Sequence, residues 1–447
     1  MPSKPWLLAG ITALLLGALS LFYWLGLTSI VGTVHDDVVY LVTGKALAEG
    51  MNYRIISHPA APIQTAYPPL YPAFLAVIWA ILPSFPENLW AFKAFNIVCA
   101  LAGVLLTYHL VTRVYQAPKW QGWLTAGLLA VGSFYVTFMD LTMSEPVFLV
   151  CLLLALIGLE RLPDSRLLGA RWTPVAIGLL AALPSMARSV GLTLAVAVVA
   201  WLLVRRQWKL AVTSAAAAAL FNMPWLAWAW WGEQLGSESW DYVSWVGGST
   251  DGFSLSAILG HAAHNAVTLV TTSLPLAVAP LVQHAHLTGL LGRLGLAGLQ
   301  PWLAVAMTLV IGLGVARTLG QRLRLLHVFL AAYLALIIVY PWDPSRFVLV
   351  LSPLLIFLFV QGACWAAESW RSPAPRRLAI ALAAGLLLTS AGAGLARAGS
   401  FVRHQTYHDA LLPEPVRVRQ ADEQALVDWA KAHVPEDGIW LHHRDPL

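Results

Sequence analysis

Long apolar runs separated by short polar or basic stretches make up most of this chain. The first run, from Trp6 to Ile30, exceeds the roughly 7–15 apolar residues of a signal peptide, and we interpret it as an uncleaved membrane anchor. Ten further runs have the length and apolar character of candidate membrane spans. They are 87–111, 121–139, 146–160, 173–187, 189–204, 209–231, 300–316, 325–341, 346–366 and 377–397.

Two more apolar segments, 68–82 and 261–299, are ambiguous, and each fits an interfacial or re-entrant helix. If 261–299 is instead a hairpin of two spans, the number of spans rises by two. The pattern therefore predicts an all-α, polytopic helical membrane protein with about 11–13 transmembrane helices. Composition agrees, because only 11% of the 447 residues are charged, against about 25% in a soluble domain.

The basic residues assign the loops to the two sides of the membrane. Fifteen basic residues fall on the predicted inner side, against the three acidic residues Glu160, Asp164 and Glu368. The fifteen are Lys4, Arg113, Lys119, Arg161, Arg166, Arg171, Arg205, Arg206, Lys209, Arg317, Arg322, Arg324, Arg371, Arg376 and Arg377. The positive-inside rule then predicts a plasma (inner) membrane protein with a cytoplasmic N-terminus and an extracytoplasmic C-terminus.

This topology makes 31–86 and 232–299 outer loops. Segment 68–82 does not cross, because a crossing there would turn Arg113 and Lys119 outward. Topology also explains the net charge of +5, so we predict no nucleic-acid partner. The three cysteines lie apart in apolar segments without a Cys-x-x-Cys pair, which is typical of helix packing.

One charge lies within an apolar stretch. Residues 172–204 have basic residues at both ends and would form one helix of about 50 Å, too long for a ~30 Å hydrocarbon core. A hairpin with its tip at "PSMARSVG" keeps both ends inside and makes Arg188 an intramembrane cation, which should face a polar cavity or an anion. The alternative is one helix kinked at Pro184, with Arg188 reaching toward the surface.

Polar residues gather on the predicted outer face. Asp36 and Asp37 follow the first span, the turn "FMDLTMSEP" carries Asp140, Ser144 and Glu145, and "DPSRF" follows the span 325–341. A carboxylate can deprotonate an attacking hydroxyl, and arginines can hold a phosphate bidentately and stabilise it as it leaves. This combination suits transfer from a lipid-linked phosphate.

Four stretches in order resemble the GT-C glycosyltransferases, over roughly residues 1 to 400. The branch of closest resemblance contains the protein O-mannosyltransferases and the lipid A aminoarabinose transferase. "HDDVVYLVTGKALAEGMNY" with "TAYPPLYPAFLAVIW" resembles the family's Asp-acidic-x-x-Tyr region, here Asp36, Asp37 and Tyr40. "LTMSEPVFL" and "ALPSMARSVGL" resemble its next two stretches, and "DPSRFVLVLSPLL" its Arg-Tyr-x-x-x-x-x-Pro segment, with Phe347 in place of tyrosine.

The resemblance implies a polyprenyl-phosphate sugar donor, a lipid, glycan or protein acceptor, and an inverting displacement. It implies that Asp36 is the general base, with Asp37 in a supporting role. We expect the donor phosphate at Arg188 and Arg346, with help from outer-loop groups. The expected outer-loop groups are Lys45, Tyr67 and His58, and the expected substrate contacts are Tyr40, Glu145 and Asp343.

Metal dependence varies across the family, so no cofactor is assigned, and a divalent metal near His35 is an open alternative. We expect residues 1–397 to form the transmembrane catalytic domain. We expect 398–447 to be the start of an extracytoplasmic domain that breaks off after "GIWLHHRDPL".

Simpler roles exist for several of these residues. Asp36 and Asp37 can cap the helix that follows them, Ser144 and Glu145 can begin the next span, and Arg346 can pair with Asp343. The competing class is a transporter or flippase of a lipid-linked or small polar substrate. Transporters place ionisable residues near the bilayer midplane and often carry internal repeats, whereas this sequence has no visible repeat and gathers its polar residues at one face.

Overall fold

A computed structural model describes residues 5–27, 31–32, 36–164, 169–235, 255–279, 293, 297–340, 342–369, 385 and 392. The described chain is helical, and its one β-bridge joins Arg54 to Ile63 in the loop between α2 and α3. Four predictions concern residues that lie wholly or mostly outside the described ones. These are His35, the outer loop 232–299 over 236–254 and most of 280–296, the span 377–397 apart from residues 385 and 392, and the C-terminal domain 398–447.

The helices of the first half follow the predicted runs. They are α1 Pro5–Leu25, α2 Asp36–Ala48, α3 Leu70–Ile81, α4 Leu89–His109, α5 Lys119–Val131, α6 Ser133–Asp140, α7 Glu145–Leu159, α8 Gly169–Ala187, α9 Leu192–Val204 and α10 Trp208–Gln234. Shorter turns are the π-helix η1 Leu110–Val114 and the 3₁₀ turns η2 Leu162–Asp164 and η3 Ser189–Gly191.

The second half is described in two stretches. A nearly continuous rod consists of α12 Leu255–Thr268, the π-helix η4 Leu269–Ser273 and α13 Leu274–Val278. The remaining elements are η6 Ala297–Leu299, α15 Gln300–Gln321, α16 Leu325–Val339, α17 Pro344–Leu349 and α18 Ser352–Ser369.

Four helical stretches are long and apolar enough to cross a membrane: Leu89–Val114, Trp208–Gln234, Gln300–Gln321 and Ser352–Ser369. Five shorter apolar helices of 10–17 residues accompany them. Together with the absence of strands among the described elements, this confirms the predicted all-α polytopic membrane fold. The exact number of spans stays a prediction.

Two predicted spans are interrupted. The run 121–139 divides into α5 and α6 because Gly132 takes an extended conformation, with φ −62° and ψ 125°. The run 346–366 divides into α17 and α18, and Pro353 in the first turn of α18 has no N–H to continue the preceding helix. In both places the apolar pattern continues across the break, so periodicity alone gives no sign of it.

The hairpin predicted within 172–204 is confirmed, and the single kinked helix is wrong. Helix α8 ends at Ala187, Arg188 is extended with φ −150° and ψ 136°, and η3 then leads into α9, which packs on α8. Gly191 allows the tight turn, because a Cβ there would overlap the backbone of Pro184 and Ser185. The turn therefore depends on a residue without a side chain.

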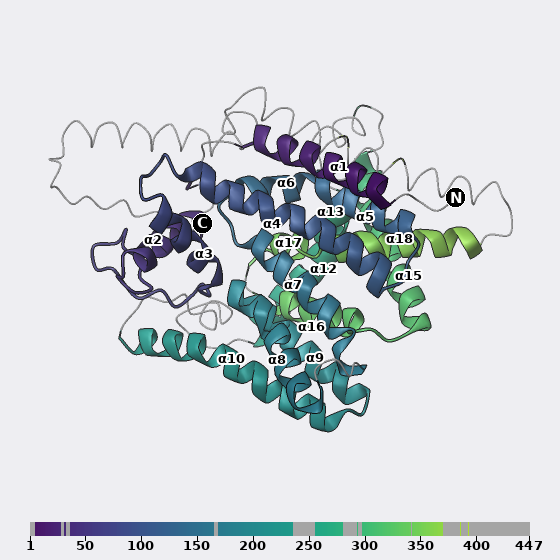
Figure 1. The fold of residues 1–447 in the computed structure, drawn as a ribbon. Helices are drawn as coiled ribbons and strands as arrows, with labels where there is room; N and C mark the ends of the chain where they lie inside the picture. Colours follow the sequence, from purple (N-terminus) through teal and green to yellow (C-terminus); the bar gives the residue numbers. More distant parts are fainter. Residues whose placement is uncertain are drawn as a thin grey trace.

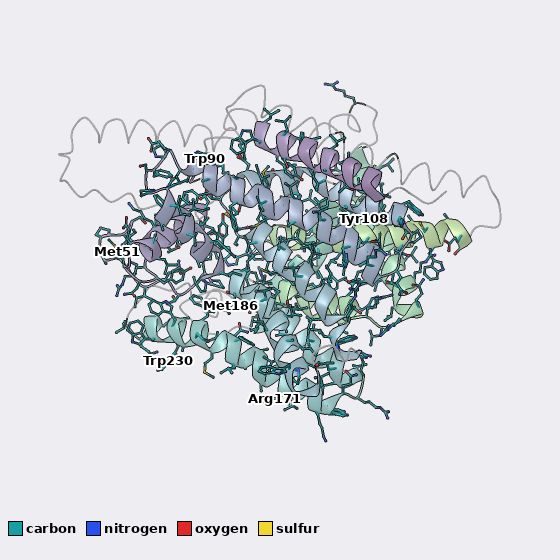
Figure 2. All side chains as sticks on the ribbon, in the orientation of Figure 1. Met51, Trp90, Tyr108, Arg171, Met186 and Trp230 are labelled. Carbon is teal, nitrogen blue, oxygen red and sulfur yellow. The ribbon has the colours of Figure 1, made fainter. Side chains whose placement is uncertain are left out.

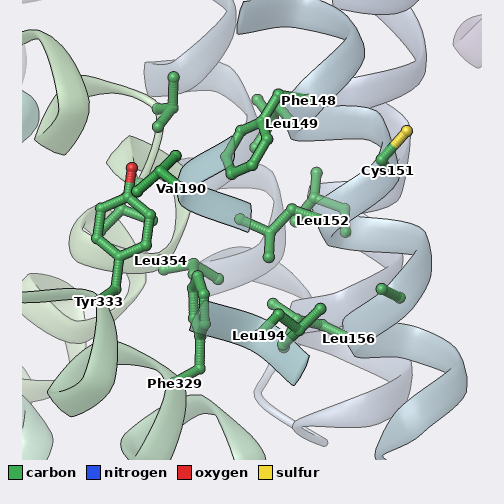
Figure 3. Packing of buried hydrophobic residues seen from close by; sticks show 14 of the residues in the cluster. Phe148, Leu149, Cys151, Leu152, Leu156, Val190, Leu194, Phe329, Tyr333 and Leu354 are labelled. Carbon is green, nitrogen blue, oxygen red and sulfur yellow. The ribbon is translucent and has the colours of Figure 1, made fainter. Parts of the chain in front are cut away.

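Helix α7 lies at the centre of the main apolar core. It packs against α4 on one side and α8 on the other, and α16 packs on α9. Figure 3 shows Phe148 and Leu152 of α7 beside Val190 and Leu194, with Phe329 and Tyr333 of α16 on the opposite side. Burial of these large side chains supplies the main stabilisation of the hairpin against the rest of the bundle.

Helices α2 and α3 pack on each other at one end of the molecule, beside the ends of α4 and α10 (Figure 1). Figure 2 shows Trp90 at the start of α4 and Trp230 near the end of α10 on this same side as Met51, with Tyr108 toward the opposite side. The start of α4 and the end of α10, both predicted to be outside, therefore share the end that carries α2 and α3.

Contacts at the other end join three of the predicted inner loops. Arg324 donates to the carbonyl of Val114 at 3.2 Å, Arg161 donates to the carbonyl of Arg113 at 3.2 Å, and Glu160 accepts from the N–H of Leu325 at 2.8 Å. The loops thus group as the charge pattern predicts. Which end faces the cytoplasm stays a prediction.

Candidate active site

Four segments that are far apart in the sequence bring two carboxylates and two guanidiniums together. Arg346 Nη2 lies 2.7 Å from Asp36 Oδ2, and Arg346 Nε donates to Glu145 Oε1 at 2.9 Å. The same Glu145 oxygen lies 2.5 Å from Arg188 Nη1. We call these four residues the outer charge cluster; they come from the starts of α2 and α7, the α8–η3 turn, and α17.

Tyrosine and serine hydroxyls extend the cluster. Tyr67 donates to Asp36 Oδ1 at 2.6 Å, so both oxygens of this carboxylate have a partner. Ser144 Oγ lies 2.9 Å from the Tyr40 hydroxyl and accepts from Arg188 Nη1 at 3.3 Å. The Tyr40 ring packs against those of Tyr67 and Tyr71, with centroids 5.2 and 5.1 Å away.

Local structure aims each charged side chain. Asp343 caps α17 by accepting from the N–H of Ser345 at 2.8 Å, and Pro344 starts the helix, so Arg346 lies in its first turn. Arg188 is the extended residue between α8 and η3, and its guanidinium lies over the ring of Phe347 at 5.6 Å. A cation over an aromatic face is attracted by the ring's electron density.

Burial differs across the cluster. The side chain of Glu145 is 2% exposed and that of Arg188 10%, whereas Asp36 is 16% exposed and Arg346 29%. The four formal charges sum to zero, which offsets the cost of removing them from water. Glu145 Oε2 is buried without a hydrogen-bond partner among the described residues. The cluster thus has a closed side at Glu145 and an accessible side at Asp36 and Arg346.

Tyr40 is a neutral hydrogen-bonding group. Burial raises the pKa of its phenol well above the ordinary value, although nearby Arg188 opposes this effect. The hydroxyl therefore keeps its proton and can hold Ser144 but cannot serve as a base near neutral pH.

Asp37 differs from its neighbour. Its side chain is fully buried and accepts from the backbone N–H groups of Gly32 and Val38, each at 2.8 Å. Adjacent helical residues diverge by about 100°, so only one of the two carboxylates can face the cluster. Asp36 faces it, and Asp37 fixes the start of α2.

Three predicted site residues have other partners. Lys45 pairs with Glu49 at 3.7 Å and lies over the ring of Trp79 at 5.6 Å. His58 is exposed and accepts from the N–H of Ala60. Asp343 caps α17 and is not the partner of Arg346, which pairs with Asp36 and Glu145 instead.

The sequence reasoning missed a buried lysine. Lys93 Nζ of α4 lies 3.0 Å from Asp140 Oδ1, and each side chain is only 1% exposed. Three residues further along α4, Asn96 donates to the carbonyl of Leu141 at 2.7 Å. Both contacts hold the turn that leads to Glu145. Lys93 could have been identified from the sequence as a charge within the apolar run 87–111, by the same argument that identified Arg188.

Metal ligands do not gather in the described part of the chain, where no three His, Cys, Asp or Glu side chains come together. His35, the residue on which the metal alternative rests, lies outside that part.

Comparison with known proteins gives a structural neighbour. The fold is similar to the crystal structure of ArnT from Cupriavidus metallidurans bound to undecaprenyl phosphate, with a TM-score of 0.53 and 16% sequence identity. The match covers 95% of this chain and 81% of that one. No family model matches the sequence, and no curated protein does.

This neighbour agrees with the fold class predicted from the sequence. At 16% identity the likeness shows the shared fold of a polytopic membrane protein. What this chain binds and transfers has to be argued from its own residues.

Proposed function

We propose that this protein is a membrane glycosyltransferase. In this proposal a sugar moves from a polyprenyl-phosphate donor to a hydroxyl of a lipid, glycan or protein acceptor on the extracytoplasmic face of the inner membrane. One observation carries the proposal: Asp36 and Arg346 lie 2.7 Å apart at the accessible side of a cluster that also contains Arg188. A base and two phosphate-binding groups are thus within reach of one substrate.

The chemistry divides between the two kinds of side chain. Asp36 takes the proton of the acceptor hydroxyl as its oxygen forms a bond to the anomeric carbon of the sugar. The bond from that carbon to the phosphate oxygen breaks, and the electron pair leaves with the phosphate. Arg188 and Arg346 stabilise the charge that develops there. Attack opposite the leaving phosphate inverts the anomeric configuration.

The phosphate has to compete for Arg346. A guanidinium carries five N–H donors, and Arg346 directs Nη2 to Asp36 and Nε to Glu145. A phosphate that accepts from Nη2 would take the place of Asp36 Oδ2 and leave that oxygen free to receive a proton. Tyr67, which donates to the other Asp36 oxygen, would keep the carboxylate oriented.

Donor and acceptor would approach from different sides. The prenyl chain stays in lipid beside the apolar helices, while the acceptor hydroxyl arrives from the aqueous side near α2. In this arrangement Tyr40 and Glu145 shape the site by holding Ser144 and the two arginines. Asp343 contributes through the helix that carries Arg346. We assign no phosphate contact to Lys45 or His58.

The test measures binding and transfer separately, with purified protein in vesicles and polyprenyl phosphates carrying a labelled hexose or pentose. Asp36→Asn is nearly isosteric but a far weaker base. Transfer should therefore fall by a factor on the order of 10²–10⁴ while donor binding persists. Asp37→Asn is the matched control and should reduce transfer less. If Asp37→Asn abolishes transfer and Asp36→Asn does not, the roles are reversed; if neither matters, the pair is a helix cap.

The competing transporter class predicts a different result. Wild-type protein would then move the labelled donor across the vesicle membrane and form no glycosylated product with any acceptor. Such flux without transfer would contradict the proposed function.

A further inference from the structure

Two side chains on α12 contact backbone carbonyls at the C-terminal end of α16. His261 Nε2 lies 2.6 Å from the carbonyl oxygen of Tyr340. Asn265, one helical turn further on and 1% exposed, directs Nδ2 to the same carbonyl at 2.8 Å and to those of Ile338 at 3.2 Å and Ile337 at 3.3 Å. These carbonyls lie at the C-terminal end of α16, where few later N–H groups are available; among the three, the carbonyl of Ile337 also accepts from the N–H of Tyr340 at 3.3 Å.

The chemistry of the contact fixes its direction. A carbonyl only accepts, so His261 Nε2 carries a hydrogen and donates it to Tyr340. Asn265 Nδ2 also approaches His261 Nε2 at 3.1 Å, but two donors form no hydrogen bond, so its N–H groups serve the carbonyls. We call His261 and Asn265 the α12 clamp.

Tyr340 connects the clamp to the arginines. Its ring packs edge-on against the ring of Phe347 with centroids 4.8 Å apart. Phe347 is the residue after Arg346, and its ring lies beneath the guanidinium of Arg188 at 5.6 Å. One aromatic ring thus touches Tyr340 on the clamped segment and Arg188 in the outer charge cluster.

Two further contacts hold the same segment. Tyr333 of α16 donates to the carbonyl of Phe347 at 2.9 Å. Ser273, at the end of η4 in the rod that contains α12, lies 3.1 Å from the hydroxyl of Ser345. The rod therefore contacts the chain before α17, at Tyr340, and within α17, at Ser345.

We propose that His261 and Asn265 are positioning residues for the arginine pair, acting through Tyr340 and Phe347. This inference rests on the proposed function, because the arginines are the groups that would hold the donor phosphate. The clamp itself does not touch substrate. Its loss shifts the Phe347 ring and loosens both guanidiniums, which weakens binding of the phosphate more than it slows the chemical step.

The experiment uses full-length protein in vesicles and measures affinity for polyprenyl phosphate without a sugar, then the donor KM and kcat. His261→Ala removes one hydrogen bond and should raise both Kd and donor KM by about three- to tenfold, with kcat nearly unchanged. His261→Gln offers an amide N–H near the position of Nε2 and should restore most of the affinity. Phe347→Leu should resemble His261→Ala, since leucine fills the space without a ring.

His264→Ala is the matched control, because His264 lies on the same helix with an exposed side chain. It should bind the lipid as wild type does. The thermal midpoint of each variant separates a shifted arginine pair from a failure to fold.

The outcomes separate this inference from the function on which it rests. If wild-type protein does not bind polyprenyl phosphate, the proposed function and the role of the clamp both fail. If wild type binds but His261→Ala binds equally well, the clamp has no positioning role and the proposed function stands. A fall in kcat without a change in KM, or no rescue by His261→Gln, would also contradict the inference.

Discussion

Two sets of buried charges share one turn of this molecule, and they differ in their access to solvent. Asp140 begins the turn and pairs with Lys93, where both side chains are 1% exposed. Glu145 ends it and holds Arg188 and Arg346, the second of which is 29% exposed. The Lys93–Asp140 pair is closed to water, whereas the outer charge cluster has one open side. Both sets contain paired charges, so access to solvent is what distinguishes the candidate site from a buried pair with a structural role.

The comparison also separates what each set of charges should do when broken. Removing one member of a closed pair leaves an uncompensated charge inside the protein, so the effect should be on folding. Removing Asp36 or Arg346 acts at the open side of the cluster, which water or substrate can reach, so the effect should be on ligand binding and transfer.

The largest expected effect is on stability at the closed pair. Lys93→Met leaves Asp140 buried without its cation, which should lower the free energy of unfolding by about 3–5 kcal/mol. The thermal midpoint in detergent measures this. The double variant Lys93→Met with Asp140→Leu should recover part of the loss, because Asp140 then leaves no charge without its cation, whereas the buried carboxylate of Asp37 still loses its electrostatic interaction with Lys93. A single variant as stable as wild type would remove the distinction between the two sets.

The next effect is on donor binding at the open cluster. Arg346→Lys keeps the charge but loses the planar fork that contacts Asp36 and Glu145, so affinity for polyprenyl phosphate should fall by about tenfold. Arg188→Ala should also weaken binding. Isothermal or filter binding with the lipid measures both, and a wild-type affinity in Arg188→Ala and Arg346→Ala would exclude these residues from the phosphate site.

Some features of this structure can be predicted from the sequence, and others cannot. The apolar runs predict most helices, and embedded charges are conspicuous enough to single out Arg188. The pairing of the charges cannot be predicted in this way, because Arg346 contacts Asp36, 310 residues away in the sequence, and Glu145, 201 residues away. Its near neighbour Asp343 is the obvious partner in the sequence, but the structure uses it as a helix cap. Tertiary packing decides between such partners.

The positions of the helix breaks also could not be predicted from the sequence. Gly132 and the segment between α17 and α18 interrupt runs that remain apolar throughout, and hydropathy does not register a change of backbone angle. The second break matters for the site, since it makes α17 a separate short helix whose first turn carries Arg346.

A smaller effect is expected at the tyrosine that orients the base. Tyr67→Phe removes the hydrogen bond to Asp36 Oδ1, which should reduce kcat by about three- to tenfold with little change in donor affinity. Steady-state kinetics over a range of donor concentrations would separate the two parameters. The opposite pattern, a raised KM with an unchanged kcat, would assign Tyr67 to the phosphate and not to the base.

The smallest effect on activity should come from cysteine variants that report topology. Arg54→Cys and Ala410→Cys should react with a membrane-impermeant thiol reagent in intact cells, because the charge pattern predicts both positions outside. Lys119→Cys should react only after the cells are opened. Labelling at position 119 in intact cells would reverse the assignment of the two ends.

The two adjacent aspartates at the start of α2 have consequences for how this chain tolerates insertions and deletions. Their letters are identical, but Asp37 is bound to the backbone of Gly32 and Val38, whereas Asp36 meets Arg346 and Tyr67. Adding or removing one residue between Asp37 and Tyr40, inside α2, would turn both aspartates by about 100° relative to the buried face of the helix. The sequence would still read Asp-Asp. However, one aspartate would then take the place of the other, and the second would face neither the cluster nor the backbone of Gly32 and Val38. A one-residue insertion or deletion at this point should therefore change the site more than many substitutions elsewhere in the chain.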